Sequence, residues 1–314
     1  MNQNKKSKIL AYAGLIFVIL VWGVSPLITL YFYKYFSPTV RIAFGGLIST
    51  VALLIISSKK LGELDKTHLK LAIPTGIFLA TANILQKIGL QYTTPTHYSF
   101  LENLSCIVVP FLVFLLIRKK PTFLTVFASV LCLASAFILT GMGSDMKSIS
   151  AVGDLLCALA GIFYGVNIAV TGVYAKKLNA PLYLMLQSFI EMTVATASVF
   201  VFDATGIEQI KFTLSLPLII INAVWILIAS TFCWLIRTNS MKHVDPTVVA
   251  VMMPFSSIVT TVCSIIAGKD SPSLGLFLGV ALGLIAIILS ELGGKEKPQK
   301  LTLPKGAENP DSYS

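Results

Sequence analysis

Residues 95–121 read PTHYSFLENLSCIVVPFLVFLLIRKKP, and residues 246–272 read PTVVAVMMPFSSIVTTVCSIIAGKDSP. A shift of 151 positions aligns the two segments without a gap, from Pro95 on Pro246 to the proline that closes each segment. Each segment contains about 20 mainly apolar residues, the length of an α-helix that crosses the roughly 30 Å hydrocarbon core of a bilayer. The sequence therefore predicts a membrane-spanning helix that occurs twice.

The rest of the chain has the same character. Of its 314 residues 55% are hydrophobic and only 12% are charged, whereas soluble proteins carry roughly 25% charged residues. Strands of a membrane barrel would be about 10 residues long and would alternate apolar with polar side chains, a pattern that these stretches lack. We therefore expect an all-α membrane protein with ten transmembrane helices, at residues 9–33, 38–57, 70–91, 95–117, 121–141, 151–174, 180–202, 213–236, 246–267 and 272–291.

Basic residues are concentrated in alternate connections between these spans. With a cytoplasmic N-terminus, eighteen of the 24 Lys and Arg residues fall on cytoplasmic loops and tails, among them Arg118, Lys176 and Arg237. This asymmetry follows the positive-inside rule, so the net charge of +10 is a topology signal and indicates no nucleic-acid partner. We predict a multi-pass protein of the cell membrane with both termini in the cytoplasm.

The repeat extends to both halves of the chain. The shift of 151 relates the third to fifth spans to the eighth to tenth, and a shift of 142 places Trp22-Gly23 on Tyr164-Gly165. Five spans per half is an odd number, so the second half must cross the membrane in the inverted orientation. The predicted organisation is a cytoplasmic tail at 1–8, a first five-helix repeat at 9–141, a second, inverted repeat at 151–291 and a disordered cytoplasmic tail at 292–314.

Two carboxylates lie within the apolar spans, Glu102 in the fourth and Glu191 in the seventh. An ionisable side chain at bilayer depth costs a few kcal/mol and usually faces the bundle interior or a wet cavity. Asn103 follows Ser99 by four residues, and Gln187 precedes Glu191 by four, so each carboxylate lies on a polar helix face. We favour a substrate cavity for both carboxylates, with an interhelical hydrogen bond or pair as the alternative.

Other polar residues share helix faces on the first and sixth spans. Trp22 and Ser25 lie on one face, and Tyr164 and Asn167 on another. For each of these residues alone, hydrogen bonding between helices is the favoured interpretation, with substrate binding as the alternative. The predicted substrate-binding residues are Glu102, Glu191, Trp22, Ser25, Tyr164, Asn167, Gln187 and Asn103.

Two cations, Arg41 and Lys87, lie near the outer membrane boundary. They either extend toward the interface, attract a substrate carboxylate or pair with Glu102. The five cysteines lie in apolar spans without paired spacing or neighbouring histidine, and the sequence contains neither a GxxxxGK[ST] loop nor an H-E-x-x-H motif. We therefore expect no catalytic residue, no cofactor and no metal site, and no ATP-driven pump.

The final span has glycine at every fourth position, Gly275, Gly279 and Gly283, which allows another helix to approach closely. The partner helix lies either in the same chain or in a second copy, so a monomer and a homodimer both remain open.

Further features occur together: Trp22-Gly23 early in the first span, Pro38 followed by Arg41, residues 90–94 (LQYTT) ending the third span, and a proline in the ninth. With the five-plus-five arrangement and the Gly-rich last helix, they make the chain resemble the drug/metabolite transporter superfamily, specifically its EamA-like ten-helix branch. The resemblance implies a carrier of amino acids, other metabolites or drugs, often moved outward.

The predicted function is secondary active transport of a small organic solute by alternating access, an amino acid or related metabolite in the direction of export. The expected partners are that solute and the lipid bilayer. One alternative is an efflux carrier for drugs or cationic compounds. Another is a membrane-embedded enzyme or scaffold, which would need a convergent Ser/Lys, Asp/Asp or His constellation. We expect a transporter and no enzyme.

Cysteine substitutions test the predicted topology. In a variant without native cysteines, cysteine at Lys59, Lys119 or Lys176 is expected to resist an impermeant thiol reagent in intact cells, because these loops face the cytoplasm. Labelling of the 118–120 loop from outside would contradict both the ten-span topology and the inverted repeat.

Overall fold

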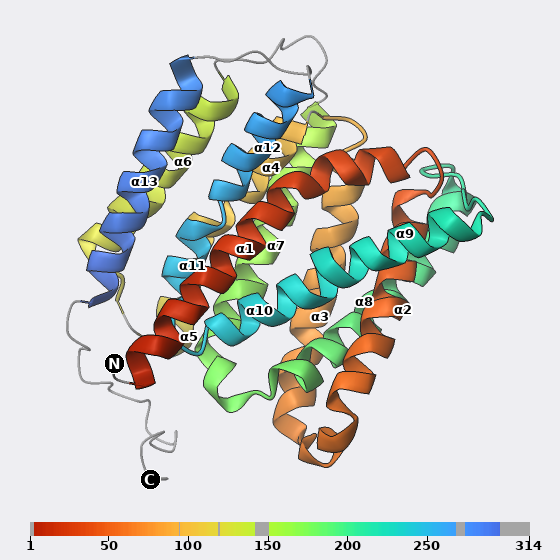
Figure 1. The fold of residues 1–314 in the computed structure, drawn as a ribbon, viewed down its shortest axis with the longest axis horizontal. Helices are drawn as coiled ribbons and strands as arrows, with labels where there is room; N and C mark the ends of the chain where they lie inside the picture. The colour runs from red at the N-terminus through yellow and green to blue at the C-terminus, as the bar shows by residue number, and fades with distance from the viewer. Residues whose placement is uncertain (1–2, 94, 119, 142–150, 268–273, 296–314) are drawn as a thin grey trace.

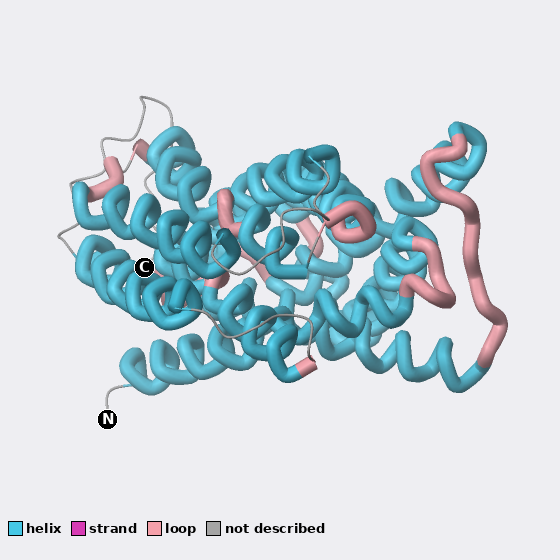
Figure 2. Tube along the Cα trace, turned by 90° about the horizontal axis from the view of Figure 1, so that it is seen from above, coloured by secondary structure: helices cyan, strands magenta, loops and turns pink. Residues whose placement is uncertain are grey.

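The computed structural model describes residues 3–93, 95–118, 120–141, 151–267 and 274–295. Every regular element in these residues is a helix, and the helices form one bundle with loops at its ends (Figures 1 and 2). The first half contains α1 (Gln3–Phe32), α2 (Pro38–Ser57), η1 (Ser58–Glu63), α3 (Lys66–Gly89), α4 (Pro95–Glu102), α5 (Ser105–Ile117) and α6 (Phe123–Gly141). The second half contains α7 (Ala151–Tyr174), η3 (Ala175–Lys177), α8 (Ala180–Thr205), α9 (Leu216–Ile226), η4 (Leu227–Phe232), α10 (Cys233–Ser240), α11 (Pro246–Met252), α12 (Phe255–Ile266) and α13 (Leu274–Lys295).

Seven helical segments of the described residues are long and apolar enough to cross a membrane. They are Lys6–Phe32, Pro38–Glu63, Lys66–Gly89, Val152–Lys177, Ala180–Thr205, Leu216–Ser240 and Pro246–Ile266. Three shorter apolar helices, Ser105–Ile117, Phe123–Ser135 and Phe277–Ser290, lie within the other three predicted spans. The all-α class is thus confirmed for the described residues, while the count of ten spans stays a prediction.

Three of the spans deviate from one continuous α-helix. The fourth is broken between α4 and α5, and the ninth between α11 and α12, where Pro254 precedes Phe255. The eighth contains the π-helical segment η4 between α9 and α10. Pro254 lies at the break in the ninth span, whereas no proline stands at the break in the fourth, at Asn103–Leu104.

The predicted ends of several spans shift for local reasons. Helix α3 begins at Lys66, four residues before the expected position, because the Asp65 carboxylate accepts hydrogen bonds from the His68 backbone N–H (2.8 Å) and pairs with its Nδ1 (2.6 Å). These hydrogen bonds hold the pKa of Asp65 at about 2. Helix α1 already begins at Gln3 and α13 continues to Lys295, so parts of the tails expected at 1–8 and 292–314 are helical. Residues 296–314 lie outside the described residues.

Helix packing joins the two halves closely. Helix α2 packs along α8, α6 along α13, α7 against α3 and α5, and α1 against α10 and α12. The α6–α13 pair lies at one side of the bundle in Figure 1, with α2 and α9 at the other. The largest apolar core joins α1, α5, α7 and α11, through residues such as Leu15, Val109, Ile168 and Val249.

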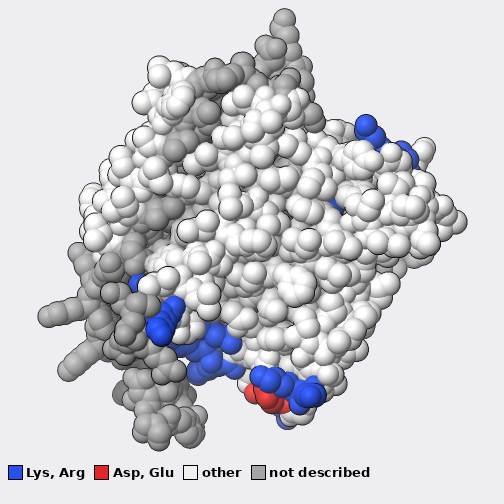
Figure 3. Space-filling view, in the orientation of Figure 1, with Lys and Arg blue, Asp and Glu red and all other residues white. Residues whose placement is uncertain are grey.

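One end of the bundle carries most of the visible charge. Helix α1 begins and α13 ends at this end (Figure 1), and most visible Lys and Arg atoms gather there (Figure 3). Lys59, Lys60, Lys176 and Lys177 are exposed, as the predicted loop positions require. The glycine stripe of the last span is buried, and Ser135 of α6 donates to the carbonyl of Gly279 (2.6 Å), so the structure provides an intramolecular partner for it.

Two glycines, Gly23 and Gly165, allow close contacts between the halves. A Cβ added at Gly23 would lie 2.8 Å from the Ser256 carbonyl oxygen and would overlap Val259, and one added at Gly165 would lie 2.9 Å from Val108. Overpacking of this kind costs about 1–3 kcal/mol.

We therefore expect Gly23→Ala and Gly165→Ala each to lower the free energy of unfolding by about that amount, measured by denaturant titration in detergent. Gly45→Ala is the matched control, because its nearest heavy atom would lie at 3.8 Å, an ordinary contact. Equal stability of all three variants would contradict the close packing.

Candidate functional site

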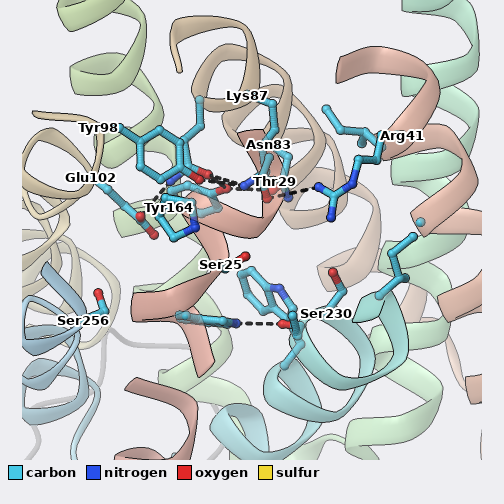
Figure 4. A pocket seen from close by; sticks show the side chains of 18 of the residues that line it. Ser25, Thr29, Arg41, Asn83, Lys87, Tyr98, Glu102, Tyr164, Ser230 and Ser256 are labelled. Atoms are coloured by element: carbon cyan, nitrogen blue, oxygen red, sulfur yellow. Dashed lines mark hydrogen bonds between the residues drawn. The ribbon is translucent and has the colours of Figure 1, made fainter. Parts of the chain in front are cut away.

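A cavity of about 120 Å³ lies inside the bundle (Figure 4). Its wall comes from α1, α2, α3, α4, α7, α8, η4, α10 and neighbouring segments, and thus from both halves of the chain. Six of the eight predicted site residues line it: Trp22, Ser25, Glu102, Asn103, Tyr164 and Glu191.

Glu102 belongs to a hydrogen-bonded network at one side of the cavity. Gln86 Nε2 donates to Glu102 Oε2 (2.7 Å), and Gln86 Oε1 accepts from the Tyr164 hydroxyl (2.7 Å). Lys87 Nζ donates to the Tyr98 hydroxyl (2.7 Å) and, more weakly, to Gln86 Oε1 (3.4 Å). Glu102 therefore contacts an amide and forms no salt bridge with Lys87, contrary to one of the interpretations that the sequence left open.

Arg41 lies at the opposite side of the cavity from Glu102 (Figure 4). Its Nε donates to Asn222 Oδ1 (3.0 Å), its Nη1 donates to Thr29 Oγ1 (3.2 Å), and its guanidinium lies over the Phe32 ring. Arg41 is therefore held against α1 and α9 and lines the cavity.

Glu191 lines the same cavity from α8. Within the described residues its carboxylate has neither a hydrogen-bond partner nor a cation within salt-bridge distance. A carboxyl group without a partner inside an apolar bundle is either protonated or, if ionised, solvated by water or a ligand.

Asn103 connects the two broken spans next to the cavity. Its Nδ2 donates to Ser257 Oγ (2.9 Å), and Ser257 Oγ donates in turn to the Ser99 carbonyl (3.0 Å). The Ser99 hydroxyl donates to Thr260 Oγ1 (3.2 Å). These side chains satisfy polar groups where the helices are interrupted, as a helix break at bilayer depth requires.

Two predicted residues, Asn167 and Gln187, lie off the wall of this cavity. Gln187 is buried and donates to Thr75 Oγ1 (2.8 Å) and to the Tyr183 hydroxyl (3.0 Å). Asn167 is also buried, and its Nδ2 donates to the Thr75 carbonyl (3.4 Å). The face patterns thus placed both residues inside the bundle, but only the packing shows that they lie behind the wall.

Arg237 is a wall residue that the sequence analysis missed, because it was assigned to a cytoplasmic loop. Helix α10 continues to Ser240, so Arg237 is helical, and its side chain is only 2% exposed. The guanidinium stacks 3.8 Å from the ring centre of Trp234 and 5.5 Å from that of Trp22. The internal repeat pointed to this position, because the shift of 151 aligns Arg237 with Gln86, a polar residue inside the third predicted span.

Aromatic rings shape the cavity beside Arg237. Trp22 and Trp234 pack with ring centres 5.4 Å apart, and Tyr164 lies 6.4 Å from Trp234. Trp22 Nε1 donates to the carbonyl of Ala229 (2.7 Å), a residue of the π-helical segment η4. All three tryptophans of the chain line the cavity.

The cavity wall thus carries three cations, Arg41, Lys87 and Arg237, and two carboxylates, Glu102 and Glu191. No two of these five described groups form a salt bridge. The described residues also contain no group of three His, Cys, Asp or Glu side chains suited to a metal ion. Such a wall can bind a solute that carries both an anionic and a cationic group.

Residues 9–141 match the model of the EamA-like transporter family. A protein of Archaeoglobus fulgidus described as an uncharacterized transporter is 22% identical over 289 residues, which cover 91% of this chain and 87% of that protein. A protein of known crystal structure has the same fold, with a TM-score of 0.70, 14% identity, and coverage of 92% of this chain and 97% of that one. The expected resemblance is confirmed: the chain is a multi-pass membrane protein with an EamA-like transporter domain at residues 9–141.

Substitution of Gln86 tests the network around Glu102. Gln86→Leu removes the donor to Glu102 and the acceptor of Tyr164, and hydrogen bonds between membrane helices average about 0.6 kcal/mol with a maximum near 1.7. We expect the free energy of unfolding to fall by about 1–2 kcal/mol, because two such bonds are lost. Gln91→Leu, at an exposed glutamine just after α3, is the control. Equal losses in the two variants would show that the network adds no stability.

Proposed function

We propose that this chain is a secondary active transporter that moves a small zwitterionic solute, such as an amino acid or a related metabolite, by alternating access. The observation that carries the proposal is the cavity between the two halves, with three cations and two carboxylates that form no salt bridge with one another. Charges inside a membrane bundle are costly, and they commonly mark substrate and ion pathways. The match to the EamA-like transporter family supports transport over catalysis.

The packing supports two inverted repeats, at 9–141 and 151–291, and thereby ten spans. Gly23 packs on Ser256 and Val259, while Gly165 packs on Ser105 and Val108. The shift of 142 relates the two glycines, and the shift of 151 relates their partners. The same contact therefore occurs twice with the halves exchanged, as a two-fold relation within the chain requires.

Helix pairing and helix breaks agree with this relation. The α2–α8 pair joins the second and seventh spans, and the α6–α13 pair joins the fifth and tenth. The fourth and ninth spans break within one residue of corresponding positions, after Glu102 and after Met252. In repeat-built transporters the substrate site lies near the bilayer midplane at the repeat interface, and one half rocks against the other around that site. We propose this mechanism here, with both termini cytoplasmic, location in the plasma membrane and transport in the direction of export.

The charges of the wall favour a zwitterion over a purely cationic drug. The wall carries three cations and two carboxylates, so it repels a cationic compound unless that compound neutralises a carboxylate. A zwitterion can pair with one cation and one carboxylate of the wall. A multidrug carrier is therefore the second candidate. Flux in proteoliposomes for amino acids, set beside flux for hydrophobic cations, distinguishes the two candidates. Comparison of metabolites inside and outside cells, with and without the protein, identifies the natural solute.

Glutamine substitutions of the carboxylates test their part in transport. Glu102→Gln and Glu191→Gln preserve shape but remove the negative charge and its titration. We expect each to reduce solute flux in proteoliposomes at least tenfold and to flatten its pH dependence, with the protein still inserted in normal amount.

Glu63→Gln, at an exposed glutamate of η1, is the matched control and is expected to transport normally. Unchanged flux of both cavity variants across the pH range would exclude the carboxylates from transport. If a variant fails to accumulate, its carboxylate serves the fold.

A further inference from the structure

Arg237 differs from the other two cations of the cavity in how few partners it has. A guanidinium carries five N–H donors. Arg41 uses two of its nitrogens, on Asn222 and Thr29, and Lys87 donates to Tyr98 and Gln86. Arg237 makes a single hydrogen bond, from Nη2 to Asn167 Oδ1 (3.1 Å), and its buried Nε has no acceptor.

The burial of Arg237 makes this shortage costly. Its side chain is 2% exposed, and within the described residues no carboxylate lies within 4.0 Å of it. Removal of a charge from water is expensive unless paired and hydrogen-bonded groups replace the water. Stacking on Trp234 at 3.8 Å replaces lost hydration on one face of the guanidinium by a cation–π interaction. It provides no hydrogen-bond acceptor for the N–H groups at the edge of the guanidinium.

The supports of Arg237 hold it in one position. Trp22 and Trp234 contact the guanidinium, and Trp22 is itself fixed by its hydrogen bond to the Ala229 carbonyl. Asn167, buried completely, accepts from Nη2 behind the cavity wall. A guanidinium fixed in this way is preorganised for a planar, two-pronged acceptor, the geometry in which arginine binds carboxylates most strongly.

The corresponding position in the first half emphasises the difference. The shift of 151 relates Arg237 to Gln86, which shares its hydrogen bonds among Glu102, Tyr164 and Lys87. The first half therefore has a neutral side chain with three hydrogen bonds where the second half has a cation without a salt-bridge partner. The asymmetry gives the cavity a cationic group on the Trp22–Trp234 side and a carboxylate, Glu102, beside the Gln86 network.

We propose that Arg237 is the residue that binds the carboxylate group of the transported solute, with Asn167 as its positioning residue. The inference rests on the proposed function and specifies which cation of the wall makes the contact. It predicts that the protein distinguishes an amino acid from the amine that lacks only the carboxylate. Arg41 and Lys87 are less suited to this role, because each already makes two hydrogen bonds within the protein, whereas Arg237 makes one.

Intrinsic fluorescence offers a direct binding assay, because the three tryptophans of the chain all line the cavity. Purified protein in detergent is titrated with each of the twenty standard amino acids, with propionate and succinate, and with the decarboxylated amine of every amino acid that responds. Wild-type protein is expected to bind the amino acid at least tenfold more tightly than the amine. Arg237→Gln introduces the residue type of Gln86, the corresponding position of the first half. This variant is expected to bind the amino acid at least tenfold more weakly than wild type and to bind the amine within twofold of the wild-type affinity.

Arg237→Lys keeps the charge but loses the two-pronged geometry, and is expected to weaken amino-acid binding several-fold. This variant also carries the test if Arg237→Gln fails to fold. Arg118→Gln, at the exposed arginine that ends α5, is the matched control and should bind as wild type does. Asn167→Leu should weaken amino-acid binding with little effect on the amine, because it frees Arg237 from its fixed position.

The outcomes separate this inference from the proposed function. Amino-acid binding that is equally tight in wild type, Arg237→Gln and Arg237→Lys, or equal losses for amino acid and amine, would overturn the role of Arg237. A wild-type protein that binds none of these carboxylates would overturn it too. If binding depends on Arg237 but no flux occurs in proteoliposomes, the carboxylate-binding role of Arg237 stands. The proposal that the protein transports the bound solute is then overturned.

Discussion

The interior charges of this membrane bundle constrain the rest of its structure. Glu102, Glu191, Arg41, Lys87 and Arg237 line one cavity, yet the structure pairs none of them as salt bridges. In water such charges would be solvated, but inside an apolar bundle only neighbouring side chains, trapped water or a bound solute can do this. The proposed role of the cavity as the site of a charged solute would meet this requirement, while hydrogen bonds from neighbouring side chains hold Glu102, Arg41, Lys87 and Arg237 in place.

The backbone contributes to the same arrangement. Two spans break beside the cavity and a third contains a π-helical segment, so backbone polar groups become available at bilayer depth. Side chains use them: Trp22 donates to the carbonyl of Ala229, Ser257 to that of Ser99, and Thr260 to that of Gly23. These hydrogen bonds link helices that lie far apart in the sequence and tie α1 and α4 to the second half. The irregular helices thus provide backbone carbonyls that side chains of other helices use as hydrogen-bond acceptors beside the cavity.

The two halves share contacts although their cavity residues differ. The glycine contacts of α1 and α7 occur twice with the halves exchanged, as the proposed two-fold relation requires. The residues that fill equivalent wall positions differ, Gln86 in one half and Arg237 in the other. A repeat that places the same backbone on both sides of a cavity can therefore present opposite chemistry to the two ends of one solute.

The sequence by itself determined the features that depend on local composition. Apolar stretches of spanning length, the all-helical class and the interior position of Glu102 and Glu191 follow from the cost of polar groups in hydrocarbon, which acts on each residue separately. The tertiary structure decided what depends on distant partners. Arg237 lies three residues from Trp234 but 215 from Trp22, and its burial follows from the packing of α10 on α1, which no local pattern records. Asn167 and Gln187 lie on the predicted faces of their helices, but only the packing turned them away from the cavity and toward Arg237 and Tyr183.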